Sequence, residues 1–374
     1  MISSLEPRGF RNLADARVEL GMEIVVFHGP NGAGKTNLLE AVYFGLVNRS
    51  FRAGSDRDMI RFEEAGARVE LELAPSAGRP SVLLSALERG GERRHLADGR
   101  EPSGATPERP LVSVFHPDRL QLVKGPAAHR RAHLDRLTAA LWPARATLRS
   151  RFGRTLAQRN ALVSRIRAGL AAASSLETWD ARLAAEAEPL MAARAAAAAG
   201  LRSPFAELAS SLGLDGATIG YRPRAESAAA DLEAELAARR GRDLGRAYTS
   251  YGPQLDEVEL RVDERPLRRF GSQGQQRSGL LALLFAERSA LIAAGRPAPI
   301  MLLDDVMSEL DPERRALLVS SLDGAGQALL TATEASQVPA TAGVVRRIAV
   351  KEGRTGSAAG TPGPRAESPD SAAA

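Results

Sequence analysis

A phosphate-binding loop is the clearest chemical signal in the sequence. Glycines at its spacing let backbone N–H groups close around phosphate oxygens, and a following helix directs its positive end at the same anion. A lysine ammonium suits the β- and γ-phosphates, and a threonine hydroxyl suits Mg²⁺. We therefore expect ATP and Mg²⁺ to bind between a strand at 23–27 and a helix at 36–46. The motif G-x-x-x-x-G-K-T is formed by Gly29, Pro30, Asn31, Gly32, Ala33, Gly34, Lys35 and Thr36.

A phosphate loop needs a carboxylate that holds the metal ion or orients the attacking water. The apolar run 299–303 predicts a buried strand, and it ends in two adjacent carboxylates, Asp304 and Asp305. We assign Asp304 with Thr36 to the metal ion, and Asp305 with Lys35 to catalysis. Asp305 stands where such ATPases usually have a glutamate, and its side chain is one methylene shorter. Because positioning dominates phosphoryl transfer, the sequence predicts a slow switch rather than a motor.

A second anion-binding end lies between the loop and the acidic strand. Ser272, Gly274 and Gln275 begin a predicted helix with a hydroxyl and free N–H groups. In this position the segment 270–277 resembles the signature motif of ABC-type ATPases, which contacts the γ-phosphate held by the opposite protomer. One chain would then carry one half of each site. We therefore expect an ATP-dependent, head-to-tail homodimer with two nucleotides.

None of the histidines lies at the position where transporter-type ABC ATPases have their switch histidine. Those enzymes have a switch histidine after the acidic strand, whereas all five histidines of this chain precede it. The role is then absent or filled otherwise, and Thr331 and Thr333 are the candidates. An ABC transporter subunit is accordingly a less favoured alternative. The histidines are His28, His95, His116, His129 and His133.

The amino-acid composition limits the classes of protein to which this chain can belong. The 374 residues are 44% hydrophobic, enough for a buried core and for two domains or one domain with an insertion. Cysteine is absent, which excludes disulfides and thiolate metal sites. There is no secretory signal and no apolar run of bilayer length, so we expect a cytoplasmic protein without a membrane partner. The net charge of +5 weakly favours a polyanionic partner.

The predicted architecture is α/β, an ABC/SMC-type P-loop ATPase core with an inserted helical lid domain. Strand-like runs at 23–27, 69–73 and 111–115 precede an Ala-, Leu- and Arg-rich helical stretch, in which Pro189 should kink or split a helix over 181–199. Strand signals return at 258–262, 299–303, 328–331 and 344–350, and intervening helices suggest parallel α/β connections. The expected parts are 1–125 (N-terminal core with the loop), 126–246 (lid), 247–352 (C-terminal core with signature, Walker B strand and D-loop) and 353–374 (disordered tail).

Taken together, these motifs resemble those of the RecF family of bacterial recombinational repair ATPases, which is related to the SMC and Rad-type ATPases. The resemblance extends from about Leu5 to Glu352 through many ordered blocks. They are Phe10-Arg-Asn12, Gly29 to Ala41, Ser50-Phe-Arg52, Leu122 to Gly125 with Arg130-Arg131, Gln158-Arg-Asn160, Tyr251-Gly-Pro253, Gly271 to Arg277, and Leu302 to Asp311.

The resemblance implies a function that spacing and composition do not. It implies an ATP-dependent dimer that binds single- and double-stranded DNA at gaps and stalled forks. It also implies the partners RecR and RecO, help in loading the RecA recombinase, and a role in the SOS response. An SMC-like structural DNA clamp with incidental ATP hydrolysis remains the alternative.

The DNA-contacting residues are predicted only as a group. Arginines crowd the start of the helical stretch and would form either a phosphate-tracking surface or a solvated helix face. Aromatic residues make up 4% of the chain, so backbone-dominated, salt-sensitive binding is expected rather than base stacking. The arginines are Arg130, Arg131, Arg149, Arg151, Arg154, Arg159, Arg165 and Arg167.

Overall fold

The described residues of this computed structural model form two compact units. The first lies within Met1–Pro117 and Pro297–Ala374, and the second within Asp118–Arg296. The second unit contains the expected lid and also residues 247–296, which the motifs group with the ATPase core. The structure describes residues 1–21, 23–52, 54–74, 81–101, 110–117, 120–225, 228–324, 326–339 and 345–356.

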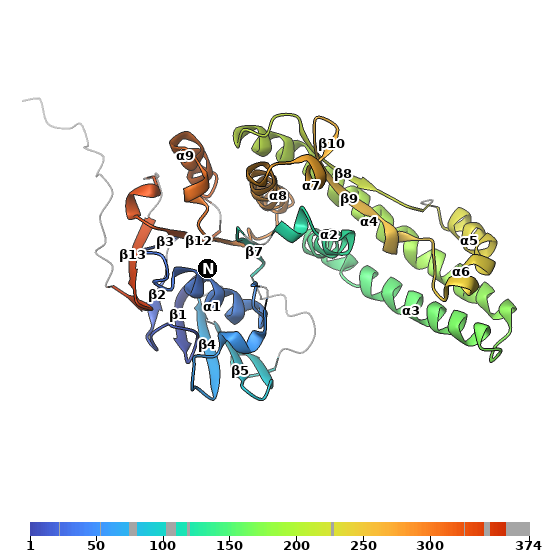
Figure 1. Cartoon of the computed structure of the whole chain (residues 1–374), viewed down its shortest axis with the longest axis horizontal. Helices are drawn as coiled ribbons and strands as arrows, with labels where there is room; N and C mark the ends of the chain where they lie inside the picture. Colours follow the sequence, from blue (N-terminus) through green and yellow to red (C-terminus); the bar gives the residue numbers. More distant parts are fainter. Residues whose placement is uncertain are drawn as a thin grey trace, which may run out of the picture. The chain divides into compact units, whose positions relative to one another are not determined.

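A six-stranded sheet organises the first unit (Figure 1), in the order β14-β13-β3-β12-β11-β7. Five strands run parallel, and β14 pairs antiparallel with β13. The strands expected here are confirmed. Ordered structure reaches residue 356, past the expected start of the tail at 353, and residues 357–374 lie outside the described part. The strands are β3 (Ile24–His28), β7 (Val112–Phe115), β11 (Ile300–Leu303), β12 (Ala328–Ala332), β13 (Val345–Lys351) and β14 (Arg354–Thr355).

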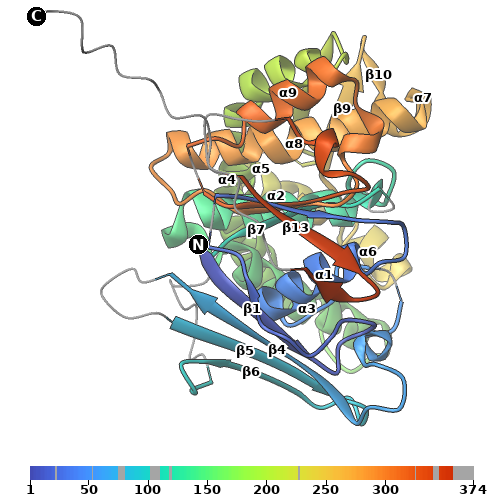
Figure 2. The same cartoon turned by 90° about the vertical axis from the view of Figure 1, so that its left-hand side faces the viewer.

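An antiparallel sheet forms the second layer of this unit, in the order β2-β1-β4-β5-β6. Helix α1 (Lys35–Val47) packs against strands of both sheets, while α9 (Pro312–Ser320) lies on the other side of the parallel sheet (Figure 2). At Gly45 a Cβ would lie 2.5 Å from Leu71, so glycine permits the close approach of α1 to β4. The strands are β1 (Ile2–Arg8), β2 (Val18–Glu19), β4 (Gly66–Leu73), β5 (Ser81–Glu88) and β6 (Arg93–Ala97).

The second unit is mainly helical. Its longest helix, α4 (Leu176–Ser211), runs through Pro189 and Pro204 without interruption, so the split expected at Pro189 does not occur. No helix of the described residues has the length and apolar character needed to cross a membrane. The other helices are α2 (Ala127–Leu141), α3 (Leu148–Arg167), α5 (Ala229–Ala238), α6 (Arg240–Arg246), α7 (Leu267–Phe270) and α8 (Gln273–Ala293).

A small antiparallel sheet accompanies these helices, with β9 (Glu257–Val262) between β8 (Ala217–Arg222) and β10 (Arg265–Pro266). The expectation that the strand at 258–262 belongs to the parallel sheet is therefore wrong. Asp263 and Glu264 both have positive φ, 47° and 64°, between the paired residues Val262 and Arg265. Two such residues form the tight turn of a hairpin, which returns the chain antiparallel.

Buried arginines tie the helices of the second unit together. Arg159 on α3 is 0% exposed and donates to Asp180 and Asp243, each at 2.7 Å, and to Thr249 at 2.8 Å. Arg194 on α4 similarly donates to Asp135 at 2.7 Å. Charges are tolerated in a protein interior only when they are paired and hydrogen-bonded, so these contacts fix the relative positions of α3, α4 and α6.

Arg159→Met should lower the free energy of unfolding by about 3–5 kcal/mol, because it takes an ion partner from two buried carboxylates. The matched control is Arg222→Met, since Arg222 pairs with Glu259 at 2.9 Å but its side chain is 56% exposed. The control should cost less than about 1 kcal/mol. Urea unfolding followed by circular dichroism measures both variants, and equal losses would contradict the assignment.

Candidate nucleotide site

The phosphate loop follows β3, the central strand of the parallel sheet, and leads into α1. Gly29 has φ +152°, and a Cβ there would collide with the carbonyl oxygen of Val350 on β13. Gly34 caps α1 with φ +107°. Both conformations are strained for residues with a side chain. The glycines of the motif thus let the loop turn sharply between the sheet and α1.

Lys35 closes over its own loop. Its Nζ donates to the carbonyl oxygens of Gly29 at 2.7 Å and Pro30 at 3.0 Å. These bonds use two of the three ammonium hydrogens, which leaves one for a phosphate oxygen. Burial lowers the pKa of Lys35, and the charges of Asp305 and Asp304 oppose that shift. The ammonium is therefore held where it can meet an anion at the mouth of the loop.

The Asp304 carboxylate joins the loop to the acidic strand. Its Oδ1 accepts hydrogen bonds from the hydroxyls of Thr36, at 2.9 Å, and Thr331, at 2.8 Å. The structure thus brings together Thr36 and Asp304, the two residues assigned to the metal. Mg²⁺ prefers hard oxygen ligands and usually takes only one or two from the protein. A hydroxyl beside a carboxylate fits that preference.

Asp305, the expected catalytic residue, has a left-handed backbone with φ 48°. Its amide donates to the Thr331 hydroxyl at 2.8 Å, and its carbonyl oxygen accepts from Ser308 at 2.9 Å. Thr331 is 1% exposed, so it acts through the two aspartates and does not itself reach outward as a switch histidine would. One buried hydroxyl therefore binds the Asp304 carboxylate and the backbone amide of Asp305, and it stabilises a backbone conformation unusual for aspartate.

His116 is a site residue that the sequence did not reveal. Its Nε2 lies 3.4 Å from Oδ2 of Asp304, and its ring packs 5.5 Å from that of Phe51. The reason is the strand order: β7 pairs in parallel with β11, with Phe115 opposite Leu303, so the next residues also face each other. Only the pairing of β7 with the acidic strand could have signalled this.

Glu40 on α1 is a second buried carboxylate behind the loop. Arg11 binds it with two bonds of 2.6 and 2.8 Å, Ser50 donates to it at 2.6 Å, and Arg52 approaches to 3.5 Å. Burial lowers the pKa of Arg52, and the charges of Glu40 and Asp304 only partly oppose this shift. Three separate blocks of the sequence, at 10–12, 37–41 and 50–52, therefore meet at one ion-pair cluster that fixes α1.

The signature residues lie in the second unit, at the start of α8. The Ser272 hydroxyl accepts a bond from the Gln275 amide at 3.2 Å, and the Gln275 side chain accepts from the Ser272 amide at 2.9 Å. This reciprocal cap leaves Ser272, Gly274 and Gln275 exposed. Behind it, the buried Gln276 donates to the carbonyls of Leu267 and Gly271, which fixes the turn. A rigid helix start therefore faces outward, as contact with a partner's nucleotide requires.

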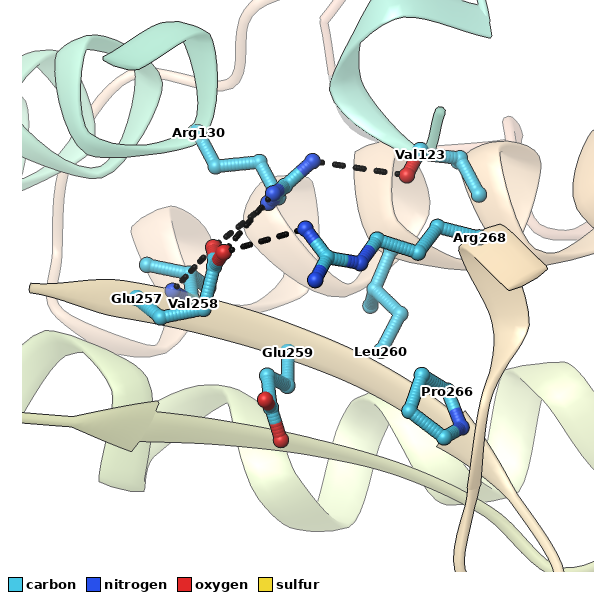
Figure 3. Close-up of a pocket in the computed structure, with 8 residues that line it drawn as sticks. All are labelled: Val123, Arg130, Glu257, Val258, Glu259, Leu260, Pro266 and Arg268. Carbon is cyan, nitrogen blue, oxygen red and sulfur yellow. Dashed lines mark hydrogen bonds and ion pairs between the residues drawn. The ribbon is translucent and has the colours of Figure 1, made fainter. Parts of the chain in front are cut away.

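The arginines proposed for DNA fall into two groups. Arg130 is buried and binds Glu257 with bonds of 2.9 and 3.0 Å, and Arg268 approaches the same carboxylate to 3.4 Å (Figure 3). Arg130 also donates to the Gly125 carbonyl at 2.7 Å. Arg130 and Arg159 thus hold the fold, and for these two residues both expected alternatives, a phosphate-tracking surface and a solvated helix face, are wrong. Arg154, Arg165 and Arg167 are exposed.

Comparison with known proteins agrees with this geometry. A family model described as an AAA domain matches residues 4–107. DNA replication and repair protein RecF of Heliobacterium modesticaldum is 37% identical over 345 residues, covering 89% of this chain and 92% of the relative. RecF of Myxococcus xanthus is also 37% identical, over 358 residues, covering 90% and 91%.

Solved structures share the fold. The recombination mediator protein RecF with ATP, of the RecFOR pathway, aligns with a TM-score of 0.82 and 23% identity over 95% of this chain and 96% of that one. An SMC head bound to the C-terminal winged-helix domain of ScpA aligns with a TM-score of 0.57 and 15% identity, covering 95% of each chain.

The fold and the site define a class of protein. A phosphate loop on a central parallel strand, with the acidic strand two places away and a large helical unit inserted between them in the sequence, makes this chain a P-loop ATPase of the ABC/SMC type. Within that class, the identity to curated relatives over nine-tenths of the chain decides the family. The chain belongs to the RecF family.

Thr331→Val should slow single-turnover ATP cleavage by about 10- to 100-fold, because an unsatisfied buried partner costs about 1–3 kcal/mol. ATP affinity should change little, since Thr331 does not reach the loop. The control is Thr331→Ser, which keeps the hydroxyl and should restore most of the rate. Quenched-flow measurements with saturating ATP test this, and a valine variant as fast as the serine variant would contradict it.

Proposed function

We propose that this chain is an ATP-dependent, DNA-binding ATPase of replication and recombinational repair, in which ATP controls a dimer. The observation that carries the proposal is the hydrogen-bonded set of Thr36, Asp304, Thr331 and Asp305 beside Lys35. These hydrogen bonds link Thr36 of the loop, the carboxylate assigned to the metal and the backbone of Asp305. By function we count residues 247–352 with the ATPase core, because they carry the signature and the acidic strand, and 126–246 as the lid.

Different residues of the site would have different roles in ATP hydrolysis. The loop amides of residues 29–36 and the Lys35 ammonium would bind and neutralise the phosphates. Thr36 and Asp304 would hold Mg²⁺, which supplies further charge neutralisation when bound. Asp305 would orient the attacking water and accept its proton. Its shorter side chain and constrained backbone support slow turnover, which suits a switch better than a motor.

The site requires a second copy of the chain. Ser272, Gly274 and Gln275 are exposed at the start of α8, where the hydroxyl and the helix N-terminus can receive a γ-phosphate. If this end completes the partner's site, two chains bind two ATP molecules head to tail. Each nucleotide then bridges the protomers, so ATP binding and dimerisation are coupled equilibria.

The cellular role rests on the family. Relatives named as DNA replication and repair proteins support a role on DNA. We propose that the chain acts in the cytoplasm on single- and double-stranded DNA at gaps, with RecO and RecR as partners and with RecA loading and the SOS response as downstream effects; a similar fold in a recombination mediator of the RecFOR pathway is consistent with these partners. The alternative is an SMC-like clamp that needs ATP only to close. Single-turnover cleavage that DNA leaves unchanged would favour the clamp.

Lys35→Met and Ser272→Arg should separate nucleotide binding from dimerisation. Lys35→Met should lose ATP binding, because it removes the ammonium that binds the phosphates. Ser272→Arg should keep ATP binding yet remain monomeric, since the bulky cation blocks the partner's site. Sedimentation velocity with labelled ATP and Mg²⁺ measures both properties. A wild type that stays monomeric at saturating ATP, or a Ser272→Arg variant that dimerises normally, would refute an ATP site shared between two protomers.

A further inference from the structure

One segment of the chain accounts for the net positive charge of this protein. Between Asp135 and Glu177 the chain has eight basic residues and no acidic one. The whole chain carries +5, so the remainder, with 42 basic and 45 acidic residues, carries −3. The segment contains all of α3. Its arginines are Arg136, Arg145, Arg149, Arg151, Arg154, Arg159, Arg165 and Arg167.

The arginines of α3 differ in what they contact. Arg159 is buried between two aspartates, and Arg151 pairs with Glu186 at 3.0 Å. By contrast, Arg154, Arg165 and Arg167 are exposed and form no ion pair with any described residue. The fold therefore supplies carboxylates for Arg151 and Arg159 and leaves these three charges without an ion-pair partner among the described residues.

The outward face of α3 is shaped for close contact with an extended anion. Its buried residues, including Phe152, Arg159 and Val163, point toward the neighbouring helices. Arg154 and Arg165 are eleven residues apart, which places them on one face about 16 Å from each other along the axis. Exposed small or polar side chains, Ala157, Gln158, Ala161 and Ser164, fill the space between them.

We propose that this outer face of α3, with Arg154 and Arg165, binds the sugar-phosphate backbone of DNA. The inference deepens the proposed function and rests on it. Duplex DNA carries one charge per about 1.7 Å of axis, so the face spans several phosphates, and arginine matches phosphate geometry bidentately. The small residues between the arginines let the backbone approach closely. An acidic membrane surface fits less well, because α3 exposes no large apolar side chain to insert.

The test is the double variant Arg154→Ala and Arg165→Ala, compared with wild type by fluorescence anisotropy on a labelled duplex with ATP and Mg²⁺. The control double variant, Arg94→Ala and Arg100→Ala, removes the same charge from exposed arginines elsewhere. We expect the α3 variant to bind about 10-fold more weakly at low salt. The slope of log K against log salt should become shallower by about 2, since each lost phosphate contact removes about 0.9.

The outcomes separate the two proposals. ATP-dependent dimerisation should be unchanged in the α3 variant, and the control double variant should bind DNA like wild type. Wild-type affinity and salt slope in the α3 variant would overturn the inference while the proposed function stands. An equal loss in the control double variant, or loss of dimerisation in the α3 variant, would also overturn it. A wild type that binds no duplex with ATP would instead refute the proposed function.

Discussion

The nucleotide site depends on satisfying one buried carboxylate, that of Asp304. A carboxylate that is 5% exposed needs partners for its oxygens, and here the partners come from different elements. Thr36 begins α1, Thr331 lies in β12, and His116 follows β7. The Asp304 amide also donates to the Phe115 carbonyl. The phosphate loop, the acidic strand and the strands beside them are therefore held at one point before any ligand binds.

The same constraint recurs wherever charge is buried in this chain. Glu40 is satisfied by Arg11, Ser50 and Arg52, and Arg159 by Asp180, Asp243 and Thr249. Leaving out one partner would strand an uncompensated charge, which costs far more than an exposed pair contributes. The short blocks that mark the family are thus explained physically. Several of them lie far apart in the sequence but contribute residues to the same buried ion-pair cluster.

Local patterns carried most of what could be predicted. The phosphate loop, the strand before Asp304 and the start of α8 at Ser272 each depend on consecutive residues, and each lies where the sequence indicates. The strand at 258–262 was assigned to the wrong sheet because its partner is decided by a hairpin at Asp263 and Glu264. Likewise, Pro189 is accommodated within α4, whose packing in the second unit outweighs a local preference.

Long-range pairing decided what could not be predicted. His116 lies 188 positions before Asp304 in the numbering, and only the order of strands brings them together. The arginines of α3 look alike in the sequence, yet Arg159 is buried and Arg154 is exposed. Which of them carries a structural charge depends on aspartates that lie on other helices. The charge count alone therefore indicated an anionic partner but not the surface that would meet it.

We propose that two copies of the chain complete each ATP site, and mixing two complementary variants tests this proposal. Lys35→Met retains a normal signature and Ser272→Arg retains a normal phosphate loop. A mixture of the two variants can therefore form one intact site per heterodimer. We expect each variant alone to stay monomeric with ATP and Mg²⁺, whereas the mixture forms heterodimers that bind one ATP, measured by sedimentation with differently labelled chains. A mixture that stays as monomeric as its components would refute the shared site.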